Sequence, residues 1–450
     1  MKPTVVALVD EGLGNSSYLV DLGDGRALAV DPPRDPSRHL AAAERQGLTI
    51  SHAAETHLHA DFVTGSPELA ARGATVVAPA AGRIEWPHRG LADGDEIELG
   101  GLRMRALGTP GHTPEHLAYL LCDGDEPVAL FSGGSLLVGS VARTDLIAPE
   151  RTEPLARALR RSIVERILTL PDDLVVYPTH GAGSFCSMPA GGERTTTIGR
   201  ERATNPLLAA PDEDSFVARL LAGLGTYPTY FSELREVNRT GPRVYGTFPR
   251  LPALDVVAAR RVLDEGAALI DVRPIARFAA GHVPRSLSIA LRPQFAPWLG
   301  WLIPRERPLL FVIDGDQDRT ELVRQCLTIG YEHVAGELAG GVDAWAAAGH
   351  PVSVIPLVEP RGLDRDRALD VRQASEYVAG HVPDAVHLEL GSLTAGLDAV
   401  PAGPITVMCG HGERAMTAAS LMAAADRHDV SVMAGGPDDW ARASGARLAS

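Results

Sequence analysis

The fold of this chain is decided by the stretch Thr56-His57-Leu58-His59-Ala60-Asp61-Phe62. Two histidines that are two residues apart at the end of an apolar stretch point to the same side of the chain. A third histidine lies further along, in the turn Gly111-His112-Thr113-Pro114. Three histidines leave one position of a four-coordinate metal open, as catalytic metal sites require. The pattern therefore predicts a metal site formed by His57, His59 and His112.

Five short motifs follow one another in the first 205 residues. They are His57-x-His59-x-Asp61, Gly111-His112-Thr113-Pro114, Phe131-Ser132-Gly133-Gly134, Arg143-Thr144-Asp145 and Tyr177-Pro178-Thr179-His180. In this order they resemble the motifs of the metallo-β-lactamase superfamily, and within it those of the glyoxalase II and persulfide dioxygenase branch. The resemblance implies an α/β fold for residues 1–205, in which two β-sheets lie face to face between outer helices (an αββα sandwich).

Two residues depart from the pattern of that family. Phe62 stands where the family has a histidine of a second metal site, and Gly134 stands where it has a metal-binding aspartate. The resemblance therefore implies one metal ion per chain, held by His57, His59 and His112. Fe(II) is favoured because persulfide dioxygenases use it, and Zn(II) is the alternative because three histidines suit zinc as well. An aspartate returned to position 134 should raise the affinity for iron.

Two further residues of the metal motifs belong to the second site of dinuclear relatives. With that site lost, Asp61 is expected to orient a metal-binding histidine by hydrogen bonding, and direct ligation is the alternative. His180 is expected to contact the substrate instead. His116 is expected to be a solvated histidine on a helix. Cys186 is close in sequence to the same loop, and a sulfur relay through it is the less favoured of two interpretations.

The second half of the chain repeats itself. Residues 271–284 read DVRPIARFAAGHVP and residues 370–383, which start 99 positions later, read DVRQASEYVAGHVP. Apolar strands alternate with helical stretches in both copies, which is typical of a parallel sheet covered by helices. Both copies resemble the rhodanese domain. We therefore predict two α/β rhodanese-like domains, at 250–355 and 358–450, with a helical connector at 206–249.

A cysteine in the second copy lies where a central strand should end and a helix should begin. Its loop reads Cys409-Gly410-His411-Gly412-Glu413-Arg414. Backbone N–H groups converge at such a point and the helix dipole favours an anion, so Cys409 is expected to be a nucleophilic sulfur carrier. Arg414 is expected to neutralise an anionic sulfur donor, whereas the acidic Glu413 disfavours thiosulfate. The first copy has Asp314 at the matching position and is expected to be a silent spacer or docking surface.

Composition limits the partners and the compartment. A net charge of −15 over 450 residues argues against nucleic acid or an anionic membrane as a partner. No stretch has the length of a membrane span or the pattern of a signal peptide. Four dispersed cysteines fit the reduced thiols of a cytoplasmic protein, and Cys326 among them is expected to pack in the first copy. The sequence leaves open whether the chain forms a homo-oligomer.

The order of the three domains resembles that of persulfide dioxygenase–sulfurtransferase fusions. The resemblance implies an enzyme that oxidises a small-molecule thiol persulfide to sulfite at the metal and transfers sulfane sulfur at Cys409. The first alternative is a metal-dependent thioester hydrolase, in which zinc lowers the pKa of a bound water. The second alternative is a non-catalytic metal domain that serves as a scaffold for a sulfur-carrier rhodanese.

Overall fold

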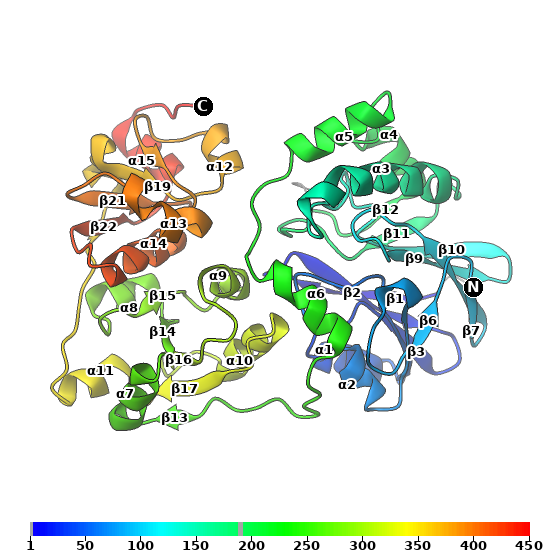
Figure 1. Ribbon diagram of the computed structural model, residues 1–450, viewed down its shortest axis with the longest axis horizontal. Coiled ribbons are helices and arrows are strands. Elements are labelled where there is room, and N and C mark those ends of the chain that lie inside the picture. Colours follow the sequence, from blue (N-terminus) through cyan, green and yellow to red (C-terminus); the bar gives the residue numbers. More distant parts are fainter. Residues whose placement is uncertain (1–2, 188–191) are drawn as a thin grey trace. The chain divides into compact units, whose positions relative to one another are not determined.

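The structure, a computed structural model, describes residues 3–187 and 192–450, and the chain forms two compact units (Figure 1). The first unit comprises Met1–Phe248 with Cys326–Gly330, and the second comprises Pro249–Gln325 with Tyr331–Ser450. None of the helices in the described ranges is both long and apolar enough to cross a bilayer.

Two six-stranded sheets form the middle of the first unit. The first sheet has, in order, β1 (Val5–Asp10), β2 (Asn15–Asp21), β3 (Arg26–Val30), β4 (Thr49–Ala54), β5 (Thr75–Pro79) and β6 (Arg89–Leu91). The second has β12 (Thr196–Thr197), β11 (Val175–Pro178), β10 (Glu126–Gly133), β9 (Leu117–Asp123), β8 (Leu102–Gly108) and β7 (Glu96–Leu99). Because side chains alternate along a strand, Tyr18 and Val20 of β2 face the core between the sheets whereas Leu19 faces outward.

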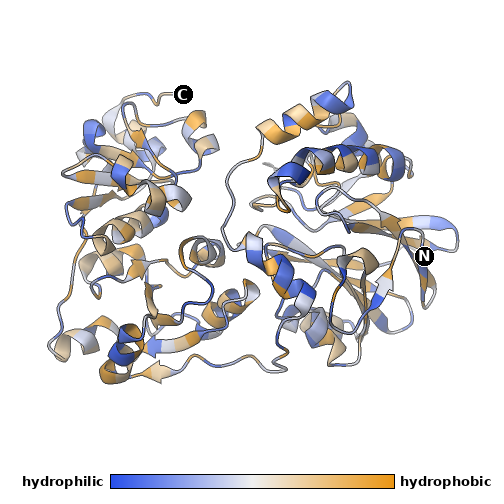
Figure 2. Cartoon of the chain, in the orientation of Figure 1, coloured by the Kyte–Doolittle hydropathy of each residue, from blue (hydrophilic) through white to orange (hydrophobic). Residues whose placement is uncertain are grey.

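Helices cover the outer face of each sheet. The helices of this unit are α1 (Ser37–Arg45), α2 (Ser66–Ala70), α3 (Thr152–Ser162), α4 (Ile198–Thr204), α5 (Glu213–Ala222) and α6 (Phe231–Thr240). Buried residues of α1 and α2 pack with the outer face of the first sheet, and those of α3 and α5 pack with the second. Helices α3 and α5 carry both polar and apolar stretches, as expected for helices with one face on a sheet (Figure 2). The predicted αββα sandwich is confirmed.

The second unit contains the two repeats, and both have the same strand order. The first repeat has the parallel sheet β13 (Ala253–Leu254), β17 (Val334–Leu338), β16 (Leu309–Val312), β14 (Ala268–Asp271) and β15 (Leu287–Ser288). Its helices are α7 (Val256–Asp264), α8 (Ile275–Ala280), α9 (Phe295–Leu302), α10 (Arg319–Thr328) and α11 (Gly341–Ala347). The second repeat has the parallel sheet β18 (Leu357–Val358), β22 (Val430–Met433), β21 (Ile405–Met408), β19 (Ala368–Asp370) and β20 (Val386–His387). Its helices are α12 (Ala374–Ala379), α13 (Leu393–Gly396), α14 (Glu413–Ala424) and α15 (Pro437–Ser444). The predicted pair of rhodanese-like α/β folds is confirmed.

The two repeats contact each other through β15 and α14. The N–H of Ser288 donates to the hydroxyl of Ser420 at 3.0 Å, and its carbonyl accepts from the hydroxyl of Thr417 at 2.6 Å. A Cβ built on Gly412 would lie 2.9 Å from Cδ1 of Ile275, in α8 of the first repeat. The first repeat therefore packs directly against the loop that carries Cys409.

Candidate functional site

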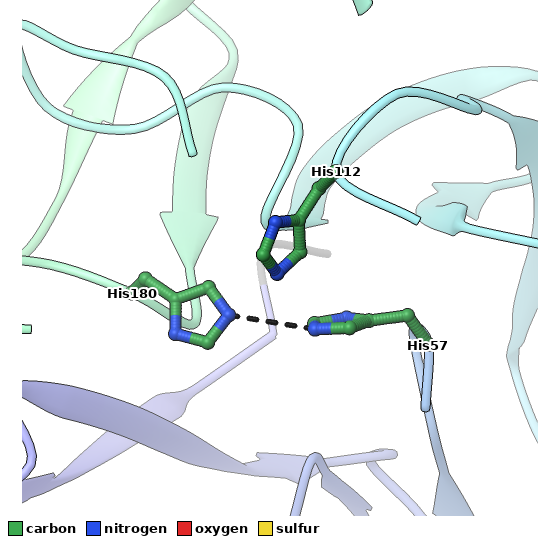
Figure 3. Close-up of side chains that lie close together, drawn as sticks. All are labelled: His57, His112 and His180. Atoms are coloured by element: carbon green, nitrogen blue, oxygen red, sulfur yellow. Dashed lines mark hydrogen bonds between the residues drawn. The ribbon is translucent and has the colours of Figure 1, made fainter. Parts of the chain in front are cut away.

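Three buried histidines meet where strands of both sheets end (Figure 3). His57 follows β4, His112 follows β8 and His180 follows β11. One ring nitrogen of each lies within 4.8 Å of those of the other two. Nε2 of His57 is 3.4 Å from Nε2 of His180. Segments far apart in the sequence thus build one site that only the folded chain can form.

Hydrogen bonds fix which nitrogen of two of these rings carries the proton. Nδ1 of His112 donates to the backbone carbonyl of Arg143 at 2.7 Å, because a carbonyl oxygen can only accept. Nδ1 of His180 donates to Oδ1 of Asn15 at 3.0 Å. The amide of Asn15 is oriented because its Nδ2 donates to the carboxylate of Asp61 at 2.7 Å. In the neutral form of either ring, Nε2 is therefore the nitrogen without a proton.

His57 has the same tautomer for a less direct reason. The hydroxyl of Thr56 donates to the carboxylate of Asp31 at 2.7 Å, so its oxygen accepts from Nδ1 of His57 at 2.9 Å. Burial and neighbouring histidines hold the pKa of His57 and of His112 well below the usual range, so these rings stay neutral. Nε2 of His57 and Nε2 of His112 therefore each carry a lone pair, and Nε2 of His180 lies 3.4 Å from Nε2 of His57.

This arrangement fits a single divalent metal ion. A metal ion is bound by the unprotonated nitrogen of a neutral imidazole. Two nitrogens that are each about 2.0–2.1 Å from a tetrahedral metal are about 3.4 Å apart, which matches the 3.4 Å between Nε2 of His57 and Nε2 of His180. Three nitrogen ligands would leave the fourth position open.

His59, the third ligand expected from the sequence, has different neighbours. Its Nε2 lies 3.3 Å from Oδ1 of Asp31 and 3.4 Å from Oε2 of Glu55, and its ring stacks on Phe62. Burial alone would lower the pKa of His59, but the two carboxylates outweigh it and raise the pKa to about 10. The set His57, His59 and His112 stays a prediction, and the geometry favours His180 as the third ligand. An acidic residue that ends the apolar strand β3 is the signal that could have pointed to Asp31.

Asp61 acts on His180 through a neighbouring amide. Its Oδ2 accepts from Asn15 and lies 3.4 Å from Nδ1 of His180. Burial raises the pKa of Asp61, but His180 and His59 outweigh this and the net shift is downward. The carboxylate is thus charged and holds Asn15 in the orientation that makes His180 a donor at Nδ1. This placement supports the expected orienting role, with Asn15 as a link that the sequence motifs did not indicate.

Helix α6, in the predicted connector, holds the histidine loop from outside. Nδ2 of Asn238 donates to the carbonyls of His59 and Phe62, each at 2.8 Å. The hydroxyl of Tyr230 donates to the carbonyl of Asp61 at 3.1 Å. Helix α6 therefore stabilises the histidine loop. The domain boundaries at 205 and 249 stay predictions.

His116 is buried, and both of its nitrogens have partners, so the expectation of a solvated histidine is wrong. The hydroxyl of Thr109 donates to the carbonyl of Leu107 at 3.4 Å, and it is 2.8 Å from Nδ1 of His116, which donates to it. Nε2 of His116 accepts from the N–H of Gly134 at 2.9 Å. His116 thus fixes the loop at Gly134 and has no lone pair left for a metal.

Gly134 lies too close to His112 to accept a side chain without movement. A Cβ at this position would lie 2.4 Å from Cδ2 of His112 and 2.8 Å from its Cγ. Contrary to the expectation from the sequence, Gly134→Asp should therefore displace a ligand ring before its carboxylate can help. We predict at least ~10-fold weaker iron binding for Gly134→Asp and for Gly134→Ala, as for other substitutions that misorient a ligand.

The measurement is competition with a chelator of known affinity. Gly101→Ala is the matched control, because a Cβ at Gly101 has no neighbour within 4 Å. Tighter iron binding by Gly134→Asp than by the unaltered chain would contradict the prediction.

Cys186 is fully buried beside the metal centre. Burial raises the pKa of its thiol, and the nearby carboxylate of Asp61 raises it further. A thiol that stays protonated is a poor nucleophile. The relay through Cys186 is therefore disfavoured. Cys326 is likewise buried, and burial raises its pKa.

The second candidate centre is the loop between β21 and α14. The N–H of Gly412 donates to Sγ of Cys409 at 3.1 Å, which supports a thiolate or persulfide at that position. Gly412 has φ +107°, a conformation that favours glycine. Gly410 and His411 complete the turn, and Glu413 is the first residue of α14. The loop thus has the backbone geometry expected for a sulfur carrier.

Arg414 does not stand free beside Cys409. Its two terminal nitrogens donate to the two carboxylate oxygens of Glu376 in α12, at 2.6 and 2.8 Å. Burial raises the pKa of Glu376, but Arg414 outweighs this and lowers it, so the carboxylate stays charged. Glu376 therefore already neutralises the charge of Arg414, and the expected neutralisation of an anionic donor by Arg414 is disfavoured. The sequence motifs did not single out Glu376.

Removing the charge of Glu376 should make Cys409 more reactive toward anions. We predict that Glu376→Gln raises the ratio of alkylation rates with anionic iodoacetate and neutral iodoacetamide about three- to tenfold, the effect of one nearby charge. Mass spectrometry of the peptide with Cys409 gives both rates. Glu359→Gln is the control, because it removes one negative charge from a residue that lies outside both the Cys409 loop and α12. An unchanged ratio in Glu376→Gln would show that Glu376 does not screen Arg414.

Comparison with known proteins identifies the class to which these two sites belong. The model of the metallo-beta-lactamase superfamily matches residues 10–180, and that of the rhodanese-like domain matches residues 256–348 and 358–443. A crystal structure of a metallo-beta-lactamase from Staphylococcus aureus subsp. aureus COL has a TM-score of 0.66 and 28% identity, covering 75% of this chain and 99% of that chain. The chain belongs to the metallo-β-lactamase superfamily and carries two rhodanese-like domains.

Curated relatives specify the branch. Hydroxyacylglutathione hydrolase of Rhodopseudomonas palustris (strain BisA53) is 32% identical over 250 residues, which are 49% of this chain and 93% of the hydrolase. Persulfide dioxygenase ETHE1, mitochondrial, of Homo sapiens is 30% identical over 203 residues, 44% of this chain and 73% of that protein. The resemblance to the glyoxalase II and persulfide dioxygenase branch is confirmed.

Proposed function

We propose that this chain oxidises a low-molecular-weight thiol persulfide at one metal ion and transfers sulfane sulfur at Cys409. In the overall reaction, one O₂ and one water convert the persulfide RSSH into the thiol RSH and sulfite. The observation that carries the proposal is the convergence of one ring nitrogen from each of His57, His112 and His180, in a chain that also holds a cysteine loop.

The residues present define what the chain contributes. His57, His112 and His180 would hold the metal, and iron, which we favour over zinc, would supply the redox chemistry that oxidation of sulfur by O₂ requires. Three neutral ligands leave the charge of a divalent cation uncompensated, which favours an anionic substrate such as a persulfide. Asp61 and Asn15 keep His180 in the ligating tautomer.

A metal-dependent hydrolase is the second candidate. Two observations favour it: the similarity to hydroxyacylglutathione hydrolase covers 93% of that enzyme, and the group His57, His112 and His180 contains no carboxylate. That set suits zinc, which lowers the pKa of a bound water and makes it a nucleophile at neutral pH.

One experiment separates the two candidates. The full chain is purified without oxygen, analysed for metals, and given either glutathione persulfide or a hydroxyacylglutathione thioester. We expect oxygen uptake and release of sulfite with the persulfide in the iron-loaded protein. Thioester hydrolysis without oxygen uptake in the iron-loaded and zinc-loaded proteins would establish the hydrolase instead.

A further inference from the structure

The first rhodanese-like repeat has a cavity where its counterpart of the Cys409 loop lies. The cavity has a volume of about 360 Å³, which is within the range of small-molecule sites. Charged residues of both signs line it, namely Arg273, Arg277, Asp314, Arg319, Glu337 and Asp343. No function considered so far uses this cavity.

Two positions at this cavity differ between the repeats in a coordinated way. Asp314 occupies the position of Cys409, and Arg277 occupies that of Glu376. In the second repeat the carboxylate of Glu376 is bound by Arg414, as described above. Arg319, the counterpart of Arg414, instead places its Nε 2.8 Å from Oε2 of Glu337. The first repeat therefore has the carboxylate of Asp314 and the guanidinium of Arg277 in addition to the ion pair of Arg319 and Glu337.

These two new charges do not satisfy each other. Nε of Arg277 is 3.9 Å from Oδ2 of Asp314, which is too long for a hydrogen bond. Within residues 3–187 and 192–450, neither side chain has another polar partner. The backbone of Asp314 is nevertheless held firmly, because its N–H donates to Gln317 at 2.9 Å and its carbonyl accepts from Arg319 at 3.2 Å. The carboxylate of Asp314 and the guanidinium of Arg277, whose side chain is 72% exposed, thus lie side by side at the cavity.

We propose that this cavity binds a small zwitterion of the α-amino acid type. The ligand's ammonium group would pair with Asp314, and its carboxylate would pair with Arg277. Ordinary bond lengths place the two charged groups of an α-amino acid roughly 3 Å apart, close to the 3.9 Å between the two protein groups. Four charges of alternating sign then lie at the corners of a square, and each attracts both of its neighbours.

Ligands of a single charge fit this cavity less well. A plain anion would meet the carboxylates of Asp314 and Glu337, and a plain cation would meet the guanidinium groups of Arg277 and Arg319. The inference is independent of the proposed persulfide oxidation, because it needs neither the metal nor a cysteine.

The test uses a probe that can neither ligate through a thiolate nor form a persulfide. S-methyl-L-cysteine is titrated into the full chain by calorimetry, beside N-acetyl-S-methylcysteine, which lacks the ammonium group, and 2-(methylthio)ethylamine, which lacks the carboxylate. We expect saturable binding of S-methyl-L-cysteine alone, and at least tenfold weaker binding to Arg277→Gln and to Asp314→Asn. Arg285→Gln, in the same repeat but outside the cavity, is the matched control and should bind as the unaltered chain does.

Melting temperatures show whether each variant folds. Absence of binding at millimolar concentrations in the unaltered chain would overturn the proposal. If N-acetyl-S-methylcysteine binds as tightly as S-methyl-L-cysteine, the ammonium group is not recognised. The cavity would then be an anion site, and the proposal of a zwitterion site would be overturned. Unchanged affinity in both Arg277→Gln and Asp314→Asn would place the binding elsewhere and would also overturn the proposal.

Discussion

Replacing His180 with alanine should reduce bound metal from about one ion per chain to almost none. The reason is geometric, because Nε2 of His180 lies 3.4 Å from Nε2 of His57. Loss of one of three ligands should weaken affinity ~100-fold or more, beyond the 10- to 100-fold typical of partners that only orient a ligand. Elemental analysis of protein purified without oxygen gives the metal content directly.

His59→Gln is the matched comparison, since His59 belongs to the set expected from the sequence. The structure places His59 beside Asp31 and Glu55, so its loss should leave the metal content unchanged. It should instead destabilise the fold by ~3 kcal/mol, because two buried carboxylates lose their common partner. Metal retained in His180→Ala and lost in His59→Gln would reverse the assignment and support His57, His59 and His112.

Replacing Cys409 with serine should lower sulfur transfer to the uncatalysed rate. A serine keeps the hydrogen bond from Gly412 but cannot form a persulfide. After incubation with a sulfane-sulfur donor, the peptide with Cys409 should gain the mass of one sulfur atom in the unaltered chain. Metal content should not change, because the histidines belong to the other compact unit.

Asp314→Ala is the control from the first repeat. Its carboxylate lies at the position of the cysteine but cannot carry sulfur, so transfer rates should stay within about twofold of the unaltered chain, since a surface charge has a small effect. Persistent transfer in Cys409→Ser would assign the sulfur carrier to Cys186 or Cys326, against the raised pKa of both thiols.

The architecture could be predicted because its signals are local. The motif around His57 and the repeat of Asp271-Val272-Arg273 at Asp370-Val371-Arg372 are short strings with a fixed order or spacing. Each string also has a local structural reason. In both repeats the arginine donates back to the carboxylate two residues earlier, which closes the turn after the strand.

The ligand set could not be predicted in the same way, because it depends on contacts between distant segments. The choice between His59 and His180 depends on Asp31, which follows β3, on Asn15 in β2, and on Glu55, four residues before His59. Asp31 and Asn15 are far from these histidines in the sequence, and only the fold brings them together.

The partner of Arg414 is missed for the same reason. Glu376 lies in α12, 38 residues before Arg414, and a different segment provides the counterpart acid in the first repeat. Steric room at Gly134 likewise depends on the ring of His112 from another loop.

The packing of β15 and α8 against α14 has a consequence for the history of the chain. A duplicated domain that has lost its nucleophile would ordinarily be free to disappear. Here Ser288 satisfies the hydroxyl of Thr417, and Ile275 occupies the space beside Gly412. A deletion of the first repeat would expose the loop of Cys409 to water and to the wrong reactants. If Cys409 carries sulfur as proposed, selection for its loop also preserves the first repeat.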